Sequence, residues 1–130
     1  MKTKILLADD NQTFVSSVKL FLSMVPNVEV VGVAHDGLQA VTEAERLQPD
    51  VALLDIAMPK MNGMEAARHL KSLPRPPKIV FLSVHDTEEY RIAAASLGVD
   101  GFVDKSDFVN ELFPIVTRLA DGTRDADTLH

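Results

Sequence analysis

A short apolar run between Pro49 and Pro59 restricts the fold of this chain more than any other segment. Val51–Leu54 is four apolar residues in succession, too few for a helix and typical of a strand that is buried on both faces. Such strands occur in parallel sheets that helices cover on each side. The run ends at Asp55, and strands of open α/β sheets present their functional groups at this end. The segment therefore predicts both a fold class and the position of a polar site.

A second apolar segment, Ile5–Ala8, also ends in acids, Asp9 and Asp10. If the two strands are neighbours, three carboxylates meet at one edge of the sheet. Two carboxylates about 4 Å apart repel by roughly 4 kcal/mol at an effective dielectric of about 20, so the cluster needs a cation or shared protons. Oxygen ligands that leave room for water and phosphate favour Mg²⁺. Asp9 or Asp10 alone could cap a helix and Asp55 alone could start a turn, but their joint occurrence favours a metal site.

The whole chain alternates short apolar runs with helical periodicity, which predicts five βα units. Such units form an α/β fold, a flavodoxin-like (βα)5 doubly wound parallel sheet with right-handed crossovers. Periodicity does not fix the strand order, but the order 2-1-3-4-5 would place the three acids together. The predicted strands are Ile5–Ala8, Val28–Ala34, Val51–Asp55, Ile79–Leu82 and Gly101–Val103, and the apolar helical stripes begin at Phe14, Ala40, Met64, Tyr90 and Phe108.

Three local features concern the helices of the second half. Asp86 and Glu89 have the spacing of a capping box, which predicts a helix that begins after Asp86. Pro114 lies within the last apolar stripe, where it favours a late helix start or a kink. Residues 121–130 are polar and continue no stripe. We therefore expect one domain over residues 1–120, followed by a frayed end or the start of a linker.

Composition excludes several classes of function. The 130 residues carry a net charge of −6 without a run of Lys or Arg, which argues against a nucleic-acid surface in this chain. The absence of cysteine excludes disulfides and thiolate chemistry. No apolar run approaches the roughly 18 residues that cross a bilayer, and the N-terminus does not resemble a signal peptide. We expect a cytoplasmic protein without a membrane partner.

Two further residues at predicted strand ends complete a pattern for phosphate binding. Ser83 follows the fourth strand and Lys105 follows the fifth. Alone, they would be interpreted as a turn hydroxyl and a solvated loop cation. Beside three carboxylates, a lysine can offset negative charge and reach a phosphate oxygen, and a hydroxyl can donate one more hydrogen bond. Because the acids would repel an anion, a metal and a phosphate are expected to bind together.

This set of residues resembles the receiver domain of two-component response regulators, in the CheY-like superfamily. The resemblance covers about residues 3–120, and the segment 58–67 is most similar to NarL-type members, which usually carry a C-terminal helix-turn-helix domain. No such DNA-binding domain is present in these residues. The resemblance rests on Asp9-Asp10, Asp55 with Met58-Pro59 and Gly63, Ser83, and Phe102 three residues before Lys105.

The resemblance implies a signalling switch and not a metabolic enzyme. Asp55 would accept a phosphoryl group from a sensor histidine kinase as a carboxylate nucleophile, and the domain would promote only its own phosphorylation and dephosphorylation. Mg²⁺ would be coordinated by Asp10, Asp55 and the backbone carbonyl of Ala57, with Asp9 reaching it through water. These ligand assignments are carried over from the family.

The resemblance also implies how the signal leaves the site. Ser83 and Lys105 would bind phosphoryl oxygens, and Phe102 would turn inward as Ser83 moves. This change would alter the surface formed by the helix that ends near Gly98, the strand Gly101–Val103 and the last helix. A homodimer could form through that surface, which would control an output domain, most often one that regulates transcription.

Three residues beside the site are expected to tune it. Val84 stands where similar domains commonly have a small residue, and its bulk is expected to slow the approach of a phosphodonor. Ala57 and His85 occupy the two positions that tune hydrolysis in similar domains. Ala57 cannot orient a water molecule, whereas His85 could either orient or obstruct one.

Three other interpretations compete with this one. A degenerate receiver would act as a phosphate-independent interaction module. The bulk of Val84 beside the site is compatible with this interpretation. A phosphatase of the haloacid-dehalogenase type also uses an Asp nucleophile and Mg²⁺, but it needs a second acid two residues later, where this chain has Ala57. A flavodoxin-like cofactor binder would need a phosphate loop after the first strand, where Asp9 and Asp10 would repel an anion.

Overall fold

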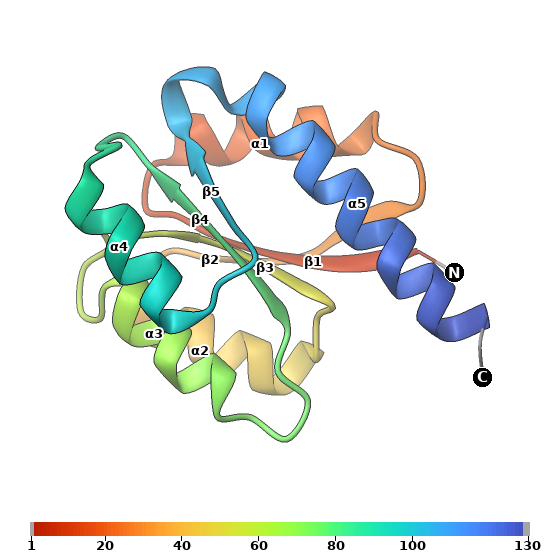
Figure 1. Cartoon of the computed structure of the whole chain (residues 1–130), viewed down its shortest axis with the longest axis horizontal. Coiled ribbons are helices and arrows are strands. Elements are labelled where there is room, and N and C mark those ends of the chain that lie inside the picture. The colour runs from red at the N-terminus through yellow and green to blue at the C-terminus, as the bar shows by residue number, and fades with distance from the viewer. Residues whose placement is uncertain (1, 129–130) are drawn as a thin grey trace.

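The computed structural model describes the backbone of residues 2–128 and the side chains of residues 2–122. Five parallel strands form one sheet in the order β2-β1-β3-β4-β5, with helices on both faces (Figure 1). This confirms the predicted flavodoxin-like fold and its strand order. The strands are β1 (Thr3–Ala8), β2 (Val28–Ala34), β3 (Val51–Asp55), β4 (Lys78–Ser83) and β5 (Gly101–Asp104), and the helices are α1 (Gln12–Ser23), α2 (Gly37–Leu47), α3 (Gly63–Lys71), α4 (Glu88–Leu97) and α5 (Phe108–Thr128).

Two apolar cores lie on opposite faces of the sheet. One packs the sheet against α1 and α5, and the other packs it against α2, α3 and α4, as the layers in Figure 1 show. The central strand β3 contributes to both, because Val51 and Leu53 enter the first core while Ala52 and Leu54 enter the second. All four are at most 1% exposed. This burial on both faces explains why the sequence of β3 contains an unbroken apolar run.

The start of α4 differs from the prediction. The helix begins at Glu88 with Thr87 as its N-cap, and the Thr87 hydroxyl accepts a hydrogen bond from the Tyr90 amide at 3.2 Å. Asp86, the predicted cap, instead binds the guanidinium of Arg91. The capping-box prediction was wrong because threonine is also a good N-cap residue, and Arg91, five residues along the chain, holds the Asp86 carboxylate.

The last helix is longer than expected. A 3₁₀ turn, η1 (Lys105–Asp107), leads into α5 at Phe108, so the helix does not start late and Pro114 lies inside it. The backbone stays helical to Thr128, so the expected frayed end does not begin at residue 121. An established helix adds residues at little cost, even where the apolar stripe has ended. Residues 129–130 of the predicted tail lie outside the described residues, and the domain boundary at residue 120 stays a prediction.

Strand register places the predicted site residues at one edge of the sheet. Ala8 of β1 pairs with Leu54 of β3, so Asp9 and Asp55 follow on adjacent strands. On the other side of β3, Ser83 of β4 pairs with Asp104 of β5, one residue before Lys105. The carboxyl ends of four strands thus deliver these side chains to the same edge.

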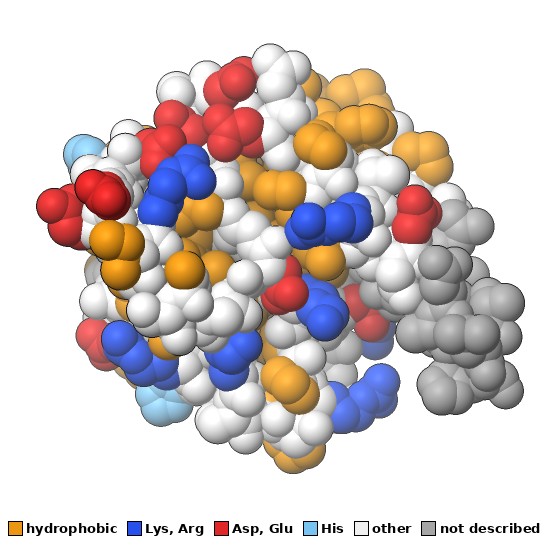
Figure 2. All heavy atoms as spheres, in the orientation of Figure 1, with side chains coloured by type: hydrophobic (Ala, Val, Ile, Leu, Met, Phe, Trp, Pro, Cys, Tyr) orange, Lys and Arg blue, Asp and Glu red, His pale blue; other side chains and the backbone are white. Residues whose placement is uncertain are grey.

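The face of the molecule shown in Figure 2 agrees with the charge balance of the sequence. On the face that Figure 2 shows, Lys and Arg side chains are scattered among acidic ones and form no continuous basic patch. Within residues 2–128, no helix has the length and apolar character needed to cross a membrane.

Candidate functional site

Three carboxylates meet at the carboxyl edge of β1 and β3. Asp9, Asp10 and Asp55 each offer an oxygen, and these oxygens lie within 4.8 Å of one another. Asp9 is fully buried and Asp55 is 5% exposed, whereas Asp10 is exposed. The cluster is therefore closed on the side of the sheet and open to solvent at Asp10.

Lys105 contacts the two buried carboxylates of this cluster. Its ammonium nitrogen lies 2.6 Å from Asp9 Oδ2 and 3.2 Å from Asp55 Oδ2, and its side chain is only 10% exposed. The lysine thus bridges two buried carboxylates and offsets part of their repulsion. The structure brings Lys105 to the edge that the sequence predicted for it.

Backbone amides hold the second oxygen of each buried carboxylate. The Asn11 amide donates to Asp9 Oδ1 at 2.9 Å, and the Ala57 amide donates to Asp55 Oδ1 at 3.2 Å. Asn11 also caps α1 by accepting from the Phe14 amide at 3.0 Å, so the turn after β1 is fixed on both sides. Each carboxylate is therefore positioned by its own strand-end turn before any ligand arrives.

The electrostatics of the cluster act most strongly on Asp55. Burial and the neighbouring charge of Asp9 raise the pKa of Asp55 from 3.8 to about 6, although Lys105 and the Ala57 amide act in the opposite direction. The raised pKa shows that burial and the charge of Asp9 together disfavour the ionised form of Asp55. A cation bound at the open side would favour the ionised form of Asp55.

Asp55→Asn is expected to stabilise the metal-free protein. The rise of its pKa to about 6 corresponds to at most about 3 kcal/mol, and solvent screening reduces the expected gain in the free energy of unfolding to about 1–2 kcal/mol at pH 7. Chemical denaturation of both proteins in the presence of a chelator would measure this gain in the free energy of unfolding. Asp107→Asn, at an exposed acid near the same edge, is the matched control.

The pH dependence of this gain follows from the direction of the pKa change. A carboxyl whose pKa is higher in the folded state stabilises the protein when it is protonated, and this contribution is lost as the pH rises through the folded pKa. The difference between Asp55→Asn and wild type should therefore vanish as the pH falls from about 7 to below about 4. A difference that grew on acidification would contradict the raised pKa.

The donor set fits a hard divalent cation. All side-chain donors are carboxylate oxygens, and Asp9 Oδ2 has no hydrogen-bond partner among the described residues beyond its ion pair with Lys105. Carboxylates that leave positions for water and phosphate suit Mg²⁺. The predicted role of the Ala57 backbone carbonyl stays a prediction.

Among the described residues, the predicted switch residues form their hydrogen bonds and packing contacts with groups other than the carboxylates. The buried Ser83 hydroxyl donates to the His85 carbonyl at 2.9 Å and accepts from the His85 amide at 3.0 Å, within its own loop. Phe102 is half-buried and packs against the core that contains α4. Val84 is 64% exposed beside Ser83, and His85 is also exposed.

Sequence reasoning missed one neighbour of the cluster. The Lys105 ammonium lies 4.6 Å from the centroid of the Phe14 ring, a cation–π contact that helps to hold the lysine over the acids. The sequence pattern places Phe14 only on the apolar face of the first helix. The available signal was its place in the first turn after Asn11, which directs it toward the edge where Asp9 lies.

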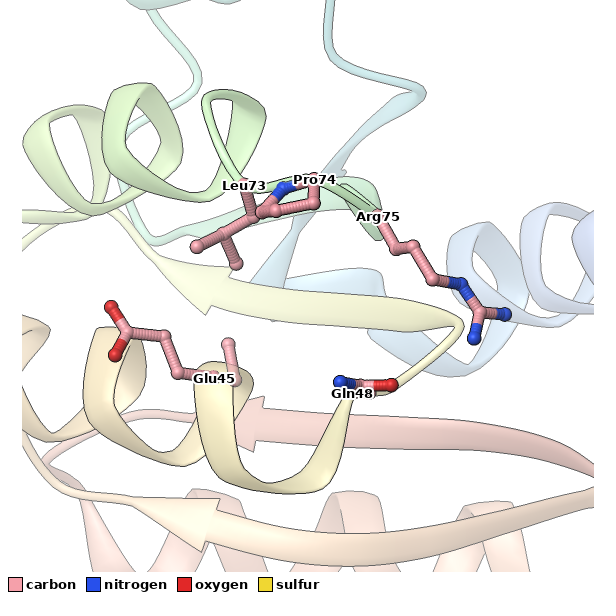
Figure 3. A pocket seen from close by; sticks show the side chains of 6 residues that line it. Glu45, Gln48, Leu73, Pro74 and Arg75 are labelled. Atoms are coloured by element: carbon pink, nitrogen blue, oxygen red, sulfur yellow. The ribbon is translucent and has the colours of Figure 1, made fainter.

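A cavity of about 350 Å³ lies away from this site. It is lined by residues from the end of α2 and from the segment after α3, as Figure 3 shows for Glu45, Gln48, Leu73, Pro74 and Arg75. None of the predicted site residues lines it. The carboxylate cluster is therefore the candidate site on chemical grounds and not on size.

Comparisons with known proteins identify the family. The response regulator receiver domain family matches residues 5–117. The chain is 40% identical over 121 residues to the transcriptional regulatory protein DegU of Brevibacillus brevis, covering 93% of this chain and 51% of DegU. It is 38% identical to the nitrate/nitrite response regulator NarL of Escherichia coli K12, covering 91% and 55% of the two chains.

A solved structure agrees with these sequence matches. The receiver domain of the putative response regulator NarL from Mycobacterium tuberculosis superposes with a TM-score of 0.86 at 34% identity, covering 93% of this chain and 98% of that one. The chain spans about half the length of the curated relatives that it matches. The chain belongs to the response regulator receiver domain family and is similar to its NarL-type members.

Proposed function

We propose that this chain is a phosphorylation-operated switch in which Asp55 accepts a phosphoryl group from a sensor histidine kinase. One observation carries the proposal: Lys105 bridges Asp9 and Asp55, while Asp10 lies at the open side of the same cluster. A buried nucleophile, a cation next to it and a free acidic edge for a metal are the parts that phosphoryl transfer to a carboxylate needs.

The transfer exchanges one bond to phosphorus for another. An Asp55 oxygen attacks phosphorus, the new P–O bond forms, and the P–N bond to the histidine of the donor breaks with its electrons leaving on the imidazole. Asp10, Asp55 and the Ala57 carbonyl would hold Mg²⁺, with Asp9 acting through water. When bound, the ion supplies positive charge against the phosphoryl oxygens.

Lys105 and Ser83 act on the phosphoryl oxygens after transfer. The Lys105 ammonium is already 3.2 Å from Asp55 Oδ2, so a small movement brings it to a phosphoryl oxygen. Ser83 must first release both of its hydrogen bonds to His85. Phosphorylation is thereby coupled to the β4–α4 loop, and Phe102 of β5 turns inward as that loop moves.

The output belongs to residues outside this chain. DegU and NarL are a transcriptional regulatory protein and a response regulator of about twice the matched length, which supports control of transcription through a further domain. The surface of α4, β5 and α5 would carry the signal and could form a homodimer. We place the protein in the cytoplasm and assign it no enzymatic activity beyond phosphorylation and dephosphorylation of Asp55.

Two alternatives keep a specific observation in their favour. A phosphate-independent interaction module is favoured by the exposed Val84 beside the site. A phosphatase is favoured only by the Asp nucleophile, because this chain has Ala57 at the position where such a phosphatase needs its second acid. Both predict no stable phosphorylated protein.

The intact mass of the protein tests the proposal. After incubation with Mg²⁺ and a small acyl phosphate, wild type and Asp107→Asn should gain one phosphoryl group, whereas Asp55→Asn and a sample with chelator should gain none. Asp107 is exposed and accepts a hydrogen bond from the Asn110 side chain, which makes it a matched acidic control. No gain in wild type would overturn the proposal.

Val84→Ala is expected to speed phosphorylation by the same donor. The Val84 side chain projects into solvent next to Ser83, so its removal clears the approach to Asp55 and should raise the rate about threefold, or about 0.6 kcal/mol of barrier. Ile92→Ala, at a comparably exposed apolar residue, is the control. Equal rates for both variants and wild type would show that Val84 does not obstruct the donor.

A further inference from the structure

A cluster outside the carboxylate site joins α4 to β5 and to the β4–α4 loop. The guanidinium of Arg91 on α4 donates to both oxygens of Asp86, with Nη2 2.9 Å from Oδ2 and Nε bonded to Oδ1. The same guanidinium lies over the ring of Phe102, with Cζ 4.6 Å from its centroid. Arg91 therefore contacts two segments that phosphorylation is expected to move.

The loop links this cluster to the Ser83 hydroxyl. Ser83 and His85 share two hydrogen bonds, and Asp86 follows His85 directly. If Ser83 turns toward Asp55, these bonds break and the backbone that carries Asp86 must shift. The ion pair between Asp86 and Arg91 resists that shift, and the stacked guanidinium resists movement of the Phe102 ring away from it.

Other charges around Arg91 hold it in place. Glu111 and Asp104 add favourable charge interactions to that of Asp86. Glu111 is itself fixed, because it accepts a hydrogen bond from the Asp104 amide at 3.1 Å. Figure 2 shows acidic side chains gathered over this corner of the molecule, near the start of α4 and the connection from β5 to α5. The guanidinium thus interacts with acidic groups of the β4–α4 loop, the end of β5 and α5.

We propose that Asp86, Arg91 and Phe102 form a latch that favours the unphosphorylated conformation, with Arg91 as the positioning residue for the Phe102 ring. The proposal rests on the proposed function. The latch holds the half-buried ring against the Arg91 guanidinium, and it holds the loop in the arrangement that keeps Ser83 bonded to His85. Phosphorylation of Asp55 must break the contact between the Phe102 ring and the guanidinium. The latch therefore shifts the equilibrium between the two conformations toward the unphosphorylated one.

The size of the effect follows from the exposure of the cluster. The Arg91 and Asp86 side chains are 48% and 36% exposed, so water screens the ion pair. An exposed ion pair and an exposed cation–π contact together bias an equilibrium by roughly threefold to tenfold. The latch therefore adjusts the switch and does not block it.

Fluorine NMR of the protein labelled with fluorophenylalanine reports the ring directly. The chain has six Phe, and the signal of Phe102 is the one that Phe102→Leu removes. Arg91→Gln should shift this signal in the unphosphorylated protein and speed phosphorylation by an acyl phosphate at least about threefold. Arg91→Lys keeps the positive charge but loses the planar guanidinium. Its Phe102 signal and its phosphorylation rate should lie between those of wild type and Arg91→Gln.

Arg46→Gln is the matched control, because Arg46 also forms an exposed ion pair, with Glu43, three residues away on α2. It should change neither the Phe102 signal nor the rate. If Arg91→Gln behaves like Arg46→Gln while wild type is phosphorylated, the latch is wrong and the proposed function stands. If wild type takes up no phosphoryl group, the proposed function fails and the coupling fails with it.

Discussion

Gly63→Ala should lower the free energy of unfolding by about 2–4 kcal/mol and abolish phosphorylation of Asp55. A Cβ atom at Gly63 would lie 2.3 Å from the Asp55 carbonyl oxygen and 2.8 Å from the Ile56 Cα. Both are backbone atoms that cannot swing aside, and the Gly63 amide also donates to the Ile56 carbonyl at 2.8 Å. The start of α3 must then move away from the end of β3, which displaces the phosphoacceptor.

Urea denaturation and intact mass measure the two parts of this prediction. Gly122→Ala is the control, because a Cβ there meets nothing within 4 Å and Gly122 lies within α5. The control should gain about 0.5–1 kcal/mol from the higher helix propensity of alanine and keep full phosphorylation. If Gly63→Ala is as stable and as readily phosphorylated as wild type, the close packing of α3 on β3 does not position Asp55.

Lys105→Gln is expected to destabilise the protein by about 2–4 kcal/mol at pH 7 without divalent cations. The substitution leaves Asp9 and Asp55 facing each other in a buried site with no cation between them, and it also removes the contact with the Phe14 ring. Added Mg²⁺ should restore part of the lost stability, because a cation again offsets the acids.

Thermal denaturation with and without Mg²⁺ checks this prediction. Lys60→Gln is the matched variant, since Lys60 pairs with Asp36 at 3.6 Å but is 66% exposed. An exposed pair contributes little, so this variant should lose less than about 0.5 kcal/mol. Equal losses in the two lysine variants would show that Lys105 does not neutralise the cluster.

Much of the fold was predictable because the helices carry periodic apolar stripes and the central strand is an unbroken apolar run. The unbroken apolar run of β3 reflects burial on both faces, and the stripe from Phe14 onward reflects one face of α1. The grouping of Asp9 with Asp55 was predictable as well, because the carboxyl ends of parallel strands meet at one edge. Register then placed the two acids on adjacent strands.

The parts that were not predicted depend on which of several equivalent partners a side chain selects. Thr87 and Asp86 are both residues that can cap α4. Thr87 is the N-cap in the structure, and the Asp86 carboxylate binds Arg91 of the same helix. The direction of the Ser83 hydroxyl depends on the path of its loop, which no periodicity records. The physical role of Gly63 appears only from the distance between α3 and β3.

The position of the phosphoryl group tests the central claim most directly. Borohydride reduces an acyl phosphate on aspartate to the alcohol, which marks the modified residue in a peptide map. After treatment with Mg²⁺ and acyl phosphate, we predict the mark on Asp55 alone, and none in a sample with chelator. A mark on Asp9 or Asp10 in place of Asp55, or the same mark without Mg²⁺, would contradict the assignment of Asp55 as the metal-assisted phosphoacceptor.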